Sequence, residues 1–368
     1  MFKEMVPILY LSHCGSSIGG GEKQLAYLVA NIDRARYCPL VVCPDDGVFV
    51  EHLRRANVPT VVLVLPPWRK VKSLITRHSA TRKLLALAKT HNACLIHTSD
   101  SWFNPYLWSL KKRLKIPVVS HARNLLTPTQ VQKYKFDRMD SIIAISEQSK
   151  TPLIQAGVDA RKIEVILNCV DLSVFQPTHG PAHPAEYVVG IVGRIEPFKC
   201  QKAFVEIAAK VTAQCKKVRF RVIGAALDTP VHRIYEREVR QLVAKYQLQE
   251  IVHFTGHRTD MPKAMQELDL LVTLSAGSVI AEAMAAGKPV IGTPVGSTAD
   301  MIVHGVTGYV VPLDPMEKIV DKIIELVKDP IQSMRIGQAA RKHAEEAFGI
   351  EAHVQKVQDI YERLLIKS

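Results

Sequence analysis

The chain has 368 residues, of which 47% are hydrophobic and 23% are charged. These fractions exclude a disordered, collagen-like or coiled-coil protein, and the length predicts two domains that can each bury a core. The net charge of +13 is uneven, because residues 1–180 hold 24 basic and 13 acidic side chains whereas residues 181–368 hold 24 and 22. A basic first half indicates an anionic partner, such as a lipid surface, a phosphorylated acceptor or nucleic acid.

The seven cysteines include no CxxC pair, and several lie inside apolar runs. We therefore expect reduced thiols in a cytosolic protein, without a zinc site or a disulfide framework. The apolar stretch near the start, Val6–Leu11, is too short for a signal sequence. No uncharged run is long enough to cross a bilayer, so the sequence predicts no membrane-spanning segment.

Short apolar runs alternate with amphipathic stretches through the first half of the chain. Such runs, rich in Val, Ile and Leu, are typical of strands buried on both faces of a sheet. The predicted strands are Pro7–Ser12, Pro39–Cys43, Pro59–Leu65, Ala93–His97, Pro117–Ser120, Ser141–Ile145 and Ile163–Leu167. The predicted helices are Glu22–Asn31, Phe49–Ala56, Ser73–Thr90, Asn104–Leu114 and Glu147–Ala156. This alternation predicts a parallel, doubly wound sheet.

The alternation stops at Gln176–Ala185, whose three Pro and one Gly can continue neither a helix nor a central strand. It then restarts with the predicted strands Tyr187–Val192, Val218–Ile223, Ile251–Phe254, Leu268–Leu274, Pro289–Gly292 and Gly308–Val311. The predicted helices are Lys202–Gln214, Val231–Tyr246, Ser278–Ala286, Pro315–Lys328, Pro330–Ala347 and Ala352–Ile366. We therefore predict a Rossmann-like domain over residues 1–176, a linker over 177–186, a second Rossmann-like domain over 187–350 and a C-terminal helix within 351–368.

A glycine-rich turn that includes Gly19 and Gly20 separates the first predicted strand from the first helix. Glycines let backbone amides approach an anion at the start of a helix. The pattern is not GxGxxG, and no acidic residue clearly follows the second strand, so NAD binding has little support. A tight turn without a ligand is an equally good interpretation.

In the second half, Gly193 ends the first predicted strand, and Arg194 and Lys199 follow before a helix. Two cations at the carboxyl end of a strand suit a diphosphate, although exposed surface cations are the alternative.

Another helix opens at Gly277, Ser278 and Val279, where backbone amides could hold phosphate and Ser278 is the expected N-cap. Glu282 follows on an otherwise apolar helix, where a carboxylate is costly without a partner. Its oxygens suit two ribose hydroxyls, and a capping or salt-bridge role is the alternative.

Arg194, Lys199 and the run Glu282–Thr293 together resemble the donor domain of retaining family 4 glycosyltransferases, which have the GT-B fold. The resemblance covers nearly the whole chain in a fixed order, through Gly19–Glu22, Ser141–Glu147, Asn168–Asp171 with Phe175, and Val295–Gly308. It implies two Rossmann-like domains facing across a cleft, with a C-terminal helix that crosses back to the first domain. It also implies that a sugar leaves a nucleotide diphosphate with retained configuration, generally without a bound metal.

The same resemblance implies roles for individual residues. Arg194 and Lys199 neutralise the departing diphosphate, and Glu282 holds the ribose. The other expected donor contacts are Gly19, Gly20, Gly193, Gly277, Ser278 and Val279.

Three residues of the first half complete the expected site. His121, just after the strand Pro117–Ser120, is placed beside the transferring sugar. Arg123 is a candidate for binding an acceptor phosphate, and His97 is expected to line the cleft. A purely structural role stays open for each of them.

The sequence departs from the family pattern at one position. The family has two glutamates eight positions apart, and counting back from Glu282 gives Leu274. The missing glutamate normally holds hydroxyls of the donor sugar. Two alternatives therefore stay open: a weakened or inactive nucleotide-binding protein of this fold, or a nucleotide-sugar epimerase.

Basic residues alternate with Trp and Leu in the first half, in Trp68–Lys72, Arg77–Lys89 and Trp108–Lys115. Such stretches can lie on an anionic lipid surface, or they can be ordinary solvated helix faces. Neither an aromatic stacking platform nor a helix-turn-helix pattern is present, so we do not expect nucleic acid as a partner.

Together, these patterns and the resemblance predict a metal-independent retaining hexosyltransferase of the cytoplasm, with a peripheral location on the inner membrane face as the alternative. The expected donor is a UDP- or GDP-linked sugar, without a further cofactor. The expected acceptor is a lipid-linked, lipopolysaccharide-type or other cell-surface glycan.

Overall fold

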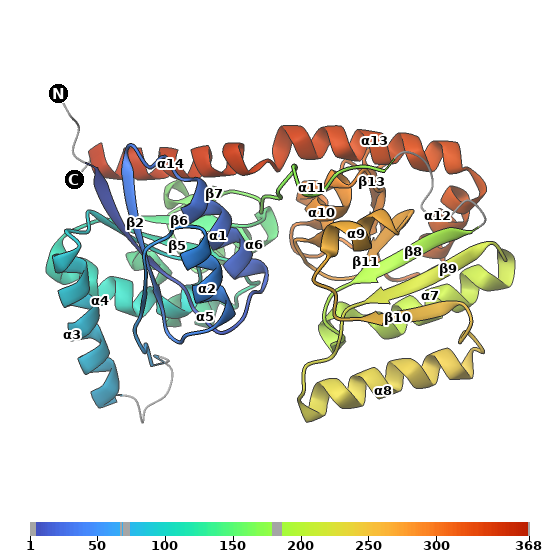
Figure 1. The fold of residues 1–368 in the computed structure, drawn as a ribbon, viewed down its shortest axis with the longest axis horizontal. Helices are drawn as coiled ribbons and strands as arrows, with labels where there is room; N and C mark the ends of the chain where they lie inside the picture. Colours follow the sequence, from blue (N-terminus) through green and yellow to red (C-terminus); the bar gives the residue numbers. More distant parts are fainter. Residues whose placement is uncertain (1–4, 67, 69–73, 179–185, 367–368) are drawn as a thin grey trace. The chain divides into compact units, whose positions relative to one another are not determined.

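The computed structural model describes residues 5–66, 68, 74–178 and 186–366. The chain forms two compact units, one of Met1–Cys169 with Ile350–Ser368 and one of Val170–Gly349 (Figure 1). Most of the predicted linker over residues 177–186 lies outside the described residues.

The first unit is built on a seven-stranded parallel sheet with the order β3-β2-β1-β4-β5-β6-β7. Its strands are β1 (Val6–Leu11), β2 (Tyr37–Cys43), β3 (Thr60–Val62), β4 (Leu95–Thr98), β5 (Val118–Ala122), β6 (Ser141–Ala144) and β7 (Ile163–Val165). Its α-helices are α1 (Gly20–Asn31), α2 (Val48–Arg55), α3 (Leu74–Thr90), α4 (Asn104–Leu114), α5 (Pro128–Lys133), α6 (Glu147–Gln155) and α14 (Ile350–Ile366). The strand order reverses between β1 and β4, where sheets of this type bind ligands at their carboxyl ends.

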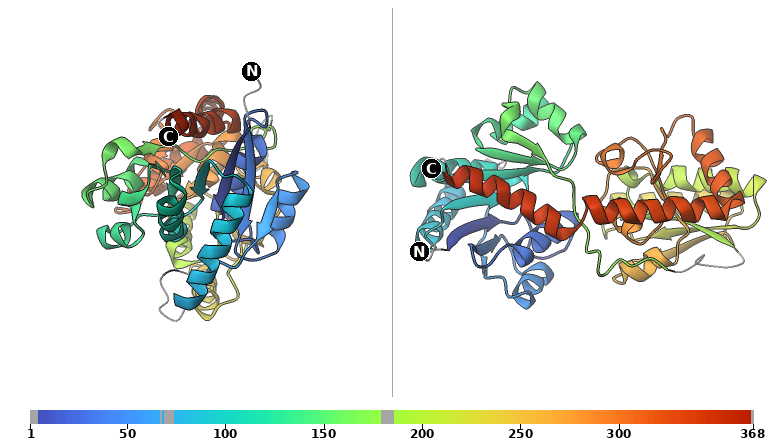
Figure 2. Two further views of the ribbon diagram at one scale, coloured as in Figure 1. Left: turned by 90° about the vertical axis from the view of Figure 1, so that its left-hand side faces the viewer. Right: turned by 90° about the horizontal axis from the view of Figure 1, so that it is seen from above.

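Apolar side chains fill both faces of this sheet. Alternate residues of β1 point to opposite faces, so Ile8 and Tyr10 belong to one core cluster and Leu9 and Leu11 to the other. The cluster with Tyr10 contains side chains of α1, α2 and α14. Figure 2 shows α14 lying across the first unit. The predicted return of the C-terminal helix to the first domain is therefore confirmed.

The second unit contains a six-stranded parallel sheet with the order β10-β9-β8-β11-β12-β13. Its strands are β8 (Tyr187–Val192), β9 (Val218–Ile223), β10 (Val252–Gly256), β11 (Leu270–Thr273), β12 (Val290–Gly292) and β13 (Gly308–Val310). Its α-helices are α7 (Gln201–Gln214), α8 (Pro230–Lys245), α9 (Met261–Gln266), α10 (Val279–Ala285), α11 (Thr298–Met301), α12 (Glu317–Lys328) and α13 (Pro330–Ala347). Two doubly wound α/β domains were predicted, and both are present.

The helices α5, α9 and α11 were not predicted, because segments of four to six residues are too short to produce a helical period. A usable signal was present at α5, where Thr127 and Gln130 form a capping box. The strand β5 is longer than predicted, so His121 lies inside it and not after it.

The basic stretches of the first half are only partly described, because residues 69–72 lie outside the described ranges. Arg77 is buried, donates a hydrogen bond to Trp68 O and lies over the Trp68 ring. The Trp108 ring is likewise covered by cations, with Lys112 at 5.0 Å and Arg138 at 5.4 Å. These aromatic faces are therefore engaged within the unit.

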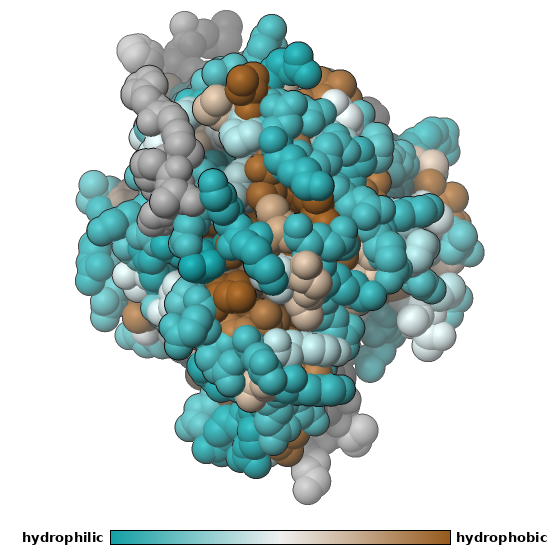
Figure 3. Space-filling model, turned by 90° about the vertical axis from the view of Figure 1, so that its right-hand side faces the viewer, coloured by the Kyte–Doolittle hydropathy of each residue, from teal (hydrophilic) through white to brown (hydrophobic). Residues whose placement is uncertain are grey.

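No helix among the described residues combines the length and the apolar character that crossing a membrane requires. The face of the molecule in Figure 3 is largely hydrophilic, with hydrophobic residues in small separate patches.

Candidate functional site

In the second unit, the strand order reverses between the parallel neighbours β8 and β11. The segment Gly193–Lys199 follows β8, and the segment Leu274–Ser278 follows β11. A hydrogen bond joins them, because Lys199 Nζ donates to Ala276 O at 2.7 Å. The predicted cation therefore lies at the position of the sheet where a ligand is expected.

The position of Lys199 depends on a glycine. Gly193 has a φ of +146°, which side chains other than glycine rarely adopt, and a Cβ there would lie 3.2 Å from Lys199 Cε. The lysine chain packs closely along this backbone, and burial lowers the pKa of its ammonium while Glu196 opposes the shift. A partly desolvated cation attracts an anion more strongly than a cation in water.

Arg194 differs from Lys199, because its side chain is 58% exposed. Its Nη2 lies 3.4 Å from Glu196 Oε1, and Glu196 Oε2 lies 3.4 Å from His232 Nε2. Gln201 Nε2 fixes the backbone by donating to Arg194 O at 2.8 Å. The guanidinium is thus accessible on a fixed backbone.

The helix α10 begins at Val279, and Gly277 and Ser278 precede it as predicted. The expected capping role of the Ser278 side chain is wrong, because φ of −70° and ψ of −12° are already helical and its hydroxyl caps no amide. A Cβ at Gly277 would lie 3.3 Å from Lys199 Nζ, so this turn adjoins the ammonium. Glu282 is buried one turn along the helix.

The position of the missing family glutamate is occupied by a core side chain. Leu274 is buried and belongs to the main apolar cluster of the second unit.

In the first unit, the glycine turn follows β1, where the strand order reverses toward β4. Gly19 is the N-cap of α1 and Gly20 is its first residue, and both are exposed. The buried Glu22 accepts a hydrogen bond from Gly19 N at 2.9 Å, and its Oε1 lies 3.0 Å from His13 Nδ1. His13 was not named from the sequence, and Glu22 was named only as the last residue of the turn Gly19–Glu22, although its spacing is that of a capping box.

Arg123 reaches the same glycine turn. A Cβ at Gly21 would lie 3.6 Å from Arg123 Cδ. The guanidinium donates from Nε to Ser99 O at 2.7 Å and from Nη1 to Asn168 Oδ1 at 3.2 Å.

Asp100 follows β4 beside this arginine, and the sequence analysis missed it. Burial raises the pKa of its carboxyl, while His13 and Arg123 oppose the rise. Its Oδ1 also accepts from Trp102 N at 3.0 Å. An acidic residue at the carboxyl end of a strand is the signal that could have found it.

His97 and His121 form a buried pair, with His97 Nε2 3.0 Å from His121 Nδ1. His97 Nδ1 contacts Tyr361 Oη of α14 at 2.5 Å, and Tyr361 donates to Tyr10 Oη at 3.2 Å. The prediction that His97 lines a cleft is wrong, since it has no exposed surface and α14 covers it. Burial lowers the pKa of His97 to about 3 and that of His121 well below its usual value, so both are neutral at pH 7.

Replacing Tyr361 by phenylalanine is expected to lower the free energy of unfolding by about 1–3 kcal/mol, because His97 loses a buried hydrogen-bond partner. Tyr37→Phe is the matched control: the two rings are in contact, and the buried Tyr37 hydroxyl has no hydrogen-bond partner among the described residues. Urea unfolding measures both changes, and equal stabilities of the two variants would contradict the prediction.

No cluster of three or more His, Cys, Asp or Glu side chains suited to a metal ion occurs among the residues that the structure describes.

Two family models match the chain. "Glycosyl transferases group 1" matches residues 179–343, and "Glycosyltransferase Family 4" matches residues 18–174. The lipopolysaccharide core biosynthesis mannosyltransferase LpsB of Rhizobium meliloti is 26% identical over 69% of this chain and 74% of its own length. The trehalose synthase of Pyrococcus horikoshii is 26% identical over 73% of this chain, which spans only 63% of that relative.

Solved structures share the fold over nearly the whole chain. Anabaena HepE in complex with UDP has a TM-score of 0.86 and 25% identity, covering 98% of this chain and 100% of its own. The apo form of the lipopolysaccharide outer core galactosyltransferase WaaB has a TM-score of 0.76 at 17% identity, with coverage of 98% and 100%, and supports the fold alone. Both halves match family models in the expected order, so the chain belongs to the group 1, family 4 glycosyltransferases of the GT-B fold.

Proposed function

We propose that this glycosyltransferase moves a hexosyl group from a UDP- or GDP-linked sugar to a lipid-linked, lipopolysaccharide-type or other cell-surface glycan, with retained configuration. The observation that carries the proposal is Lys199, whose ammonium is fixed between the segments that follow β8 and β11. Two similar proteins add support, since HepE was solved with UDP and LpsB acts in lipopolysaccharide core biosynthesis.

The departing nucleoside diphosphate carries the negative charge that develops during transfer. Lys199 supplies a partly desolvated cation, and the exposed Arg194 can fold over the same phosphates from a fixed backbone. Fixed charges of this kind stabilise a leaving group without reorganisation. In this proposal they do the work that a metal ion does in other transferases.

The remaining donor contacts belong to the backbone and to one carboxylate. Gly193 and Gly277 leave room beside Lys199, so the phosphates can approach the main chain closely. Glu282 lies one turn into α10 and accepts hydrogen bonds from the ribose hydroxyls in this proposal.

The first unit contributes the acceptor side. Arg123 is the acceptor-binding residue of this proposal, and through Gly21 it lies in contact distance of the turn whose Gly19 and Gly20 are proposed as donor contacts. His121 is neutral, so it can accept or donate a hydrogen bond at the transferring sugar without carrying charge. We place the enzyme in the cytoplasm, with the exposed cations of α3 available to an anionic membrane surface.

A panel of nucleotide sugars tests the donor. UDP-glucose, UDP-galactose, UDP-N-acetylglucosamine and GDP-mannose are each added in a thermal unfolding series. Binding to the folded state alone stabilises by roughly 2.7 kcal/mol at one hundred times the dissociation constant. We expect at least one compound to raise the Tm and to be consumed with release of its nucleotide. If none raises the Tm, the proposed function is wrong.

The substitution Glu282→Gln is expected to raise the KM for the nucleotide sugar by roughly 10- to 100-fold, because a charged acceptor for the ribose is lost. Glu317→Gln is the control, since Glu317 is paired with Lys210 on the surface of the second unit. Initial rates over a range of donor concentrations give both values. An unchanged KM in Glu282→Gln removes this residue from the donor site.

A second candidate function follows from Leu274, which puts a core side chain where the family has a sugar-binding glutamate. In this second candidate function, the protein binds the nucleotide but does not transfer the sugar. Nucleotide binding without turnover favours this alternative, and a changed sugar in the nucleotide product favours an epimerase.

A further inference from the structure

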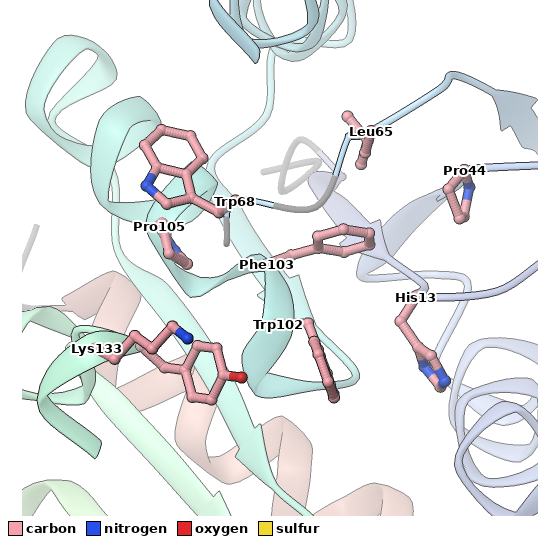
Figure 4. Close-up of a pocket in the computed structure, with 9 residues that line it drawn as sticks. His13, Pro44, Leu65, Trp68, Trp102, Phe103, Pro105 and Lys133 are labelled. Carbon is pink, nitrogen blue, oxygen red and sulfur yellow. The ribbon is translucent and has the colours of Figure 1, made fainter. Parts of the chain in front are cut away.

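A cavity of about 390 Å³ lies within the first unit. Of the residues described above for the candidate site, only His13 and Trp102 line it. Its walls are mainly aromatic and proline side chains: Pro44, Trp68, Trp102, Phe103, Pro105 and Tyr134 (Figure 4). This volume falls in the range of about 300–1,000 Å³ that is usual for small-molecule pockets.

The lining residues come from one edge of the sheet. Five consecutive strands of the sheet, β3, β2, β1, β4 and β5, are each followed in the chain by a lining residue. In that order these residues are Leu65, Pro44, His13, Trp102 and Tyr134. All five strands are parallel, so these residues gather beyond their carboxyl ends. That edge is where sheets of this type bind their ligands.

Two of the residues that line the cavity have partners near the proposed acceptor side. His13 lines it and also contacts Glu22 at 3.0 Å, beside the glycine turn. Trp102 lines it, and its backbone amide is held by Asp100 at 3.0 Å. A ligand in the cavity therefore touches His13 and Trp102. Their partners Glu22 and Asp100 in turn interact with the glycine turn and with Arg123.

The aromatic rings of the cavity are held in place by neighbouring side chains. The Trp102 and Tyr134 rings are 5.8 Å apart and tilted by 47°. The Trp68 ring packs edge-on against Tyr106 at 4.9 Å and is covered by Arg77 at 5.2 Å. In Figure 4, Trp102, Phe103 and Trp68 border the same space, with Lys133 at its edge.

These properties identify the class of ligand. A pyranose ring has an apolar C–H face that packs on aromatic rings, and its hydroxyls suit the indole N–H and phenol groups. A polyprenyl chain calls for a long aliphatic channel, which this compact aromatic cavity does not offer. On the basis of the proposed transferase function, we propose that the cavity is an acceptor subsite for an uncharged hexopyranosyl residue, with Trp102 and Tyr134 as its platform.

Tryptophan fluorescence tests this directly, because the chain has three tryptophans and two of them line the cavity. The variant Trp108→Phe removes the third. It is titrated with methyl α-D-glucopyranoside, methyl α-D-mannopyranoside and methyl α-D-galactopyranoside. We expect a saturable change in emission with at least one, and an apparent dissociation constant raised about tenfold or more when Trp102→Leu is added. Trp102→Tyr keeps a ring and is expected to retain binding, and circular dichroism checks that both variants fold.

Two further probes separate the competing occupants. If geranyl phosphate or inorganic phosphate changes the emission and no glycoside does, the proposal is overturned in favour of a lipid or anion site. If no probe changes it, the cavity is not a sugar site. Repeating the nucleotide-sugar Tm series on Trp102→Leu distinguishes the proposed transferase function from the proposed subsite. If the nucleotide sugar still raises the Tm as in the wild type but no glycoside binds to the wild type, only the subsite proposal is overturned. Glycoside binding in a protein that binds no nucleotide sugar overturns the acceptor role.

Discussion

Replacing Lys199 by alanine is expected to reduce the rate of sugar transfer by about 10²–10³-fold, the usual cost of removing one fixed group that stabilises developing charge. The side chain is half-buried, its methylene groups pack along Gly193 and its ammonium is oriented by Ala276 O, whereas the side chain of Arg194 is exposed. The variant is expected to fold, because a desolvated cation is itself unfavourable in the absence of a ligand. Initial rates of nucleotide release, with the nucleotide sugar that stabilises the wild type, measure the effect.

A second lysine provides the control. Lys202 lies on α7, only three positions along the chain, and pairs with Glu238 at 2.5 Å. Lys202→Ala is expected to keep the wild-type rate. Lys199→Arg keeps the positive charge but changes the shape of the side chain, so we expect its transfer rate to lie between those of Lys199→Ala and the wild type. If Lys199→Ala and Lys202→Ala are equally active, Lys199 does not bind the leaving diphosphate.

Acid is expected to destabilise the protein by roughly 3–4 kcal/mol per pH unit between pH 6 and pH 5. Three histidines of the first unit are buried and neutral: burial lowers the pKa of His97 to about 3, that of His353 to about 4, and that of His121 well below its usual value. In the unfolded chain the same groups bind protons near pH 6.5. The unfolded state therefore holds more protons, and stability rises with pH up to about 7.

Urea unfolding at pH 7, 6 and 5 measures this slope. His353 accounts for about one third of it, so His353→Gln is expected to reduce the slope by about 1.2 kcal/mol per pH unit. The glutamine can still bond to Leu167 O, which His353 Nδ1 contacts at 2.9 Å. His78→Gln is the control at an exposed position of α3 and is expected to leave the slope unchanged. A slope that is the same in all three proteins contradicts the assignment to buried histidines.

The sequence predicted the elements well because strands buried on both faces carry an unmistakable apolar pattern. It could not predict contacts that depend on distant segments. His97 was placed at a cleft because it ends an apolar run, but Tyr361, 264 residues later, covers it. The contact of Lys199 with Ala276 is of the same kind, since only the neighbouring positions of β8 and β11 bring the two loops together.

Residues of the candidate site could be predicted where a local sequence motif determines the backbone conformation. They were missed where the site depends on side chains from different strands that contact one another. Gly193 was named from its place at the end of a strand and from the family resemblance, and its φ of +146° is one that other residues rarely adopt. Ser278 was predicted to cap the helix because serine is a common N-cap residue, but its helical dihedral angles exclude that role for its side chain. Asp100 has no motif, and its relation to Arg123 becomes visible only when β4 and β5 lie side by side.

The first unit is assembled from two separated parts of the chain, because α14 supplies Val354, Val357 and Tyr361 to the core that contains β1. During synthesis on the ribosome, residues 1–169 therefore emerge long before their core can be completed. The second unit is continuous from Val170 to Gly349 and can fold earlier. A premature stop codon shortly before Ile350 should thus damage the beginning of the protein more than its middle. Expression of the first unit alone calls for α14 to be joined to it or supplied as a separate peptide.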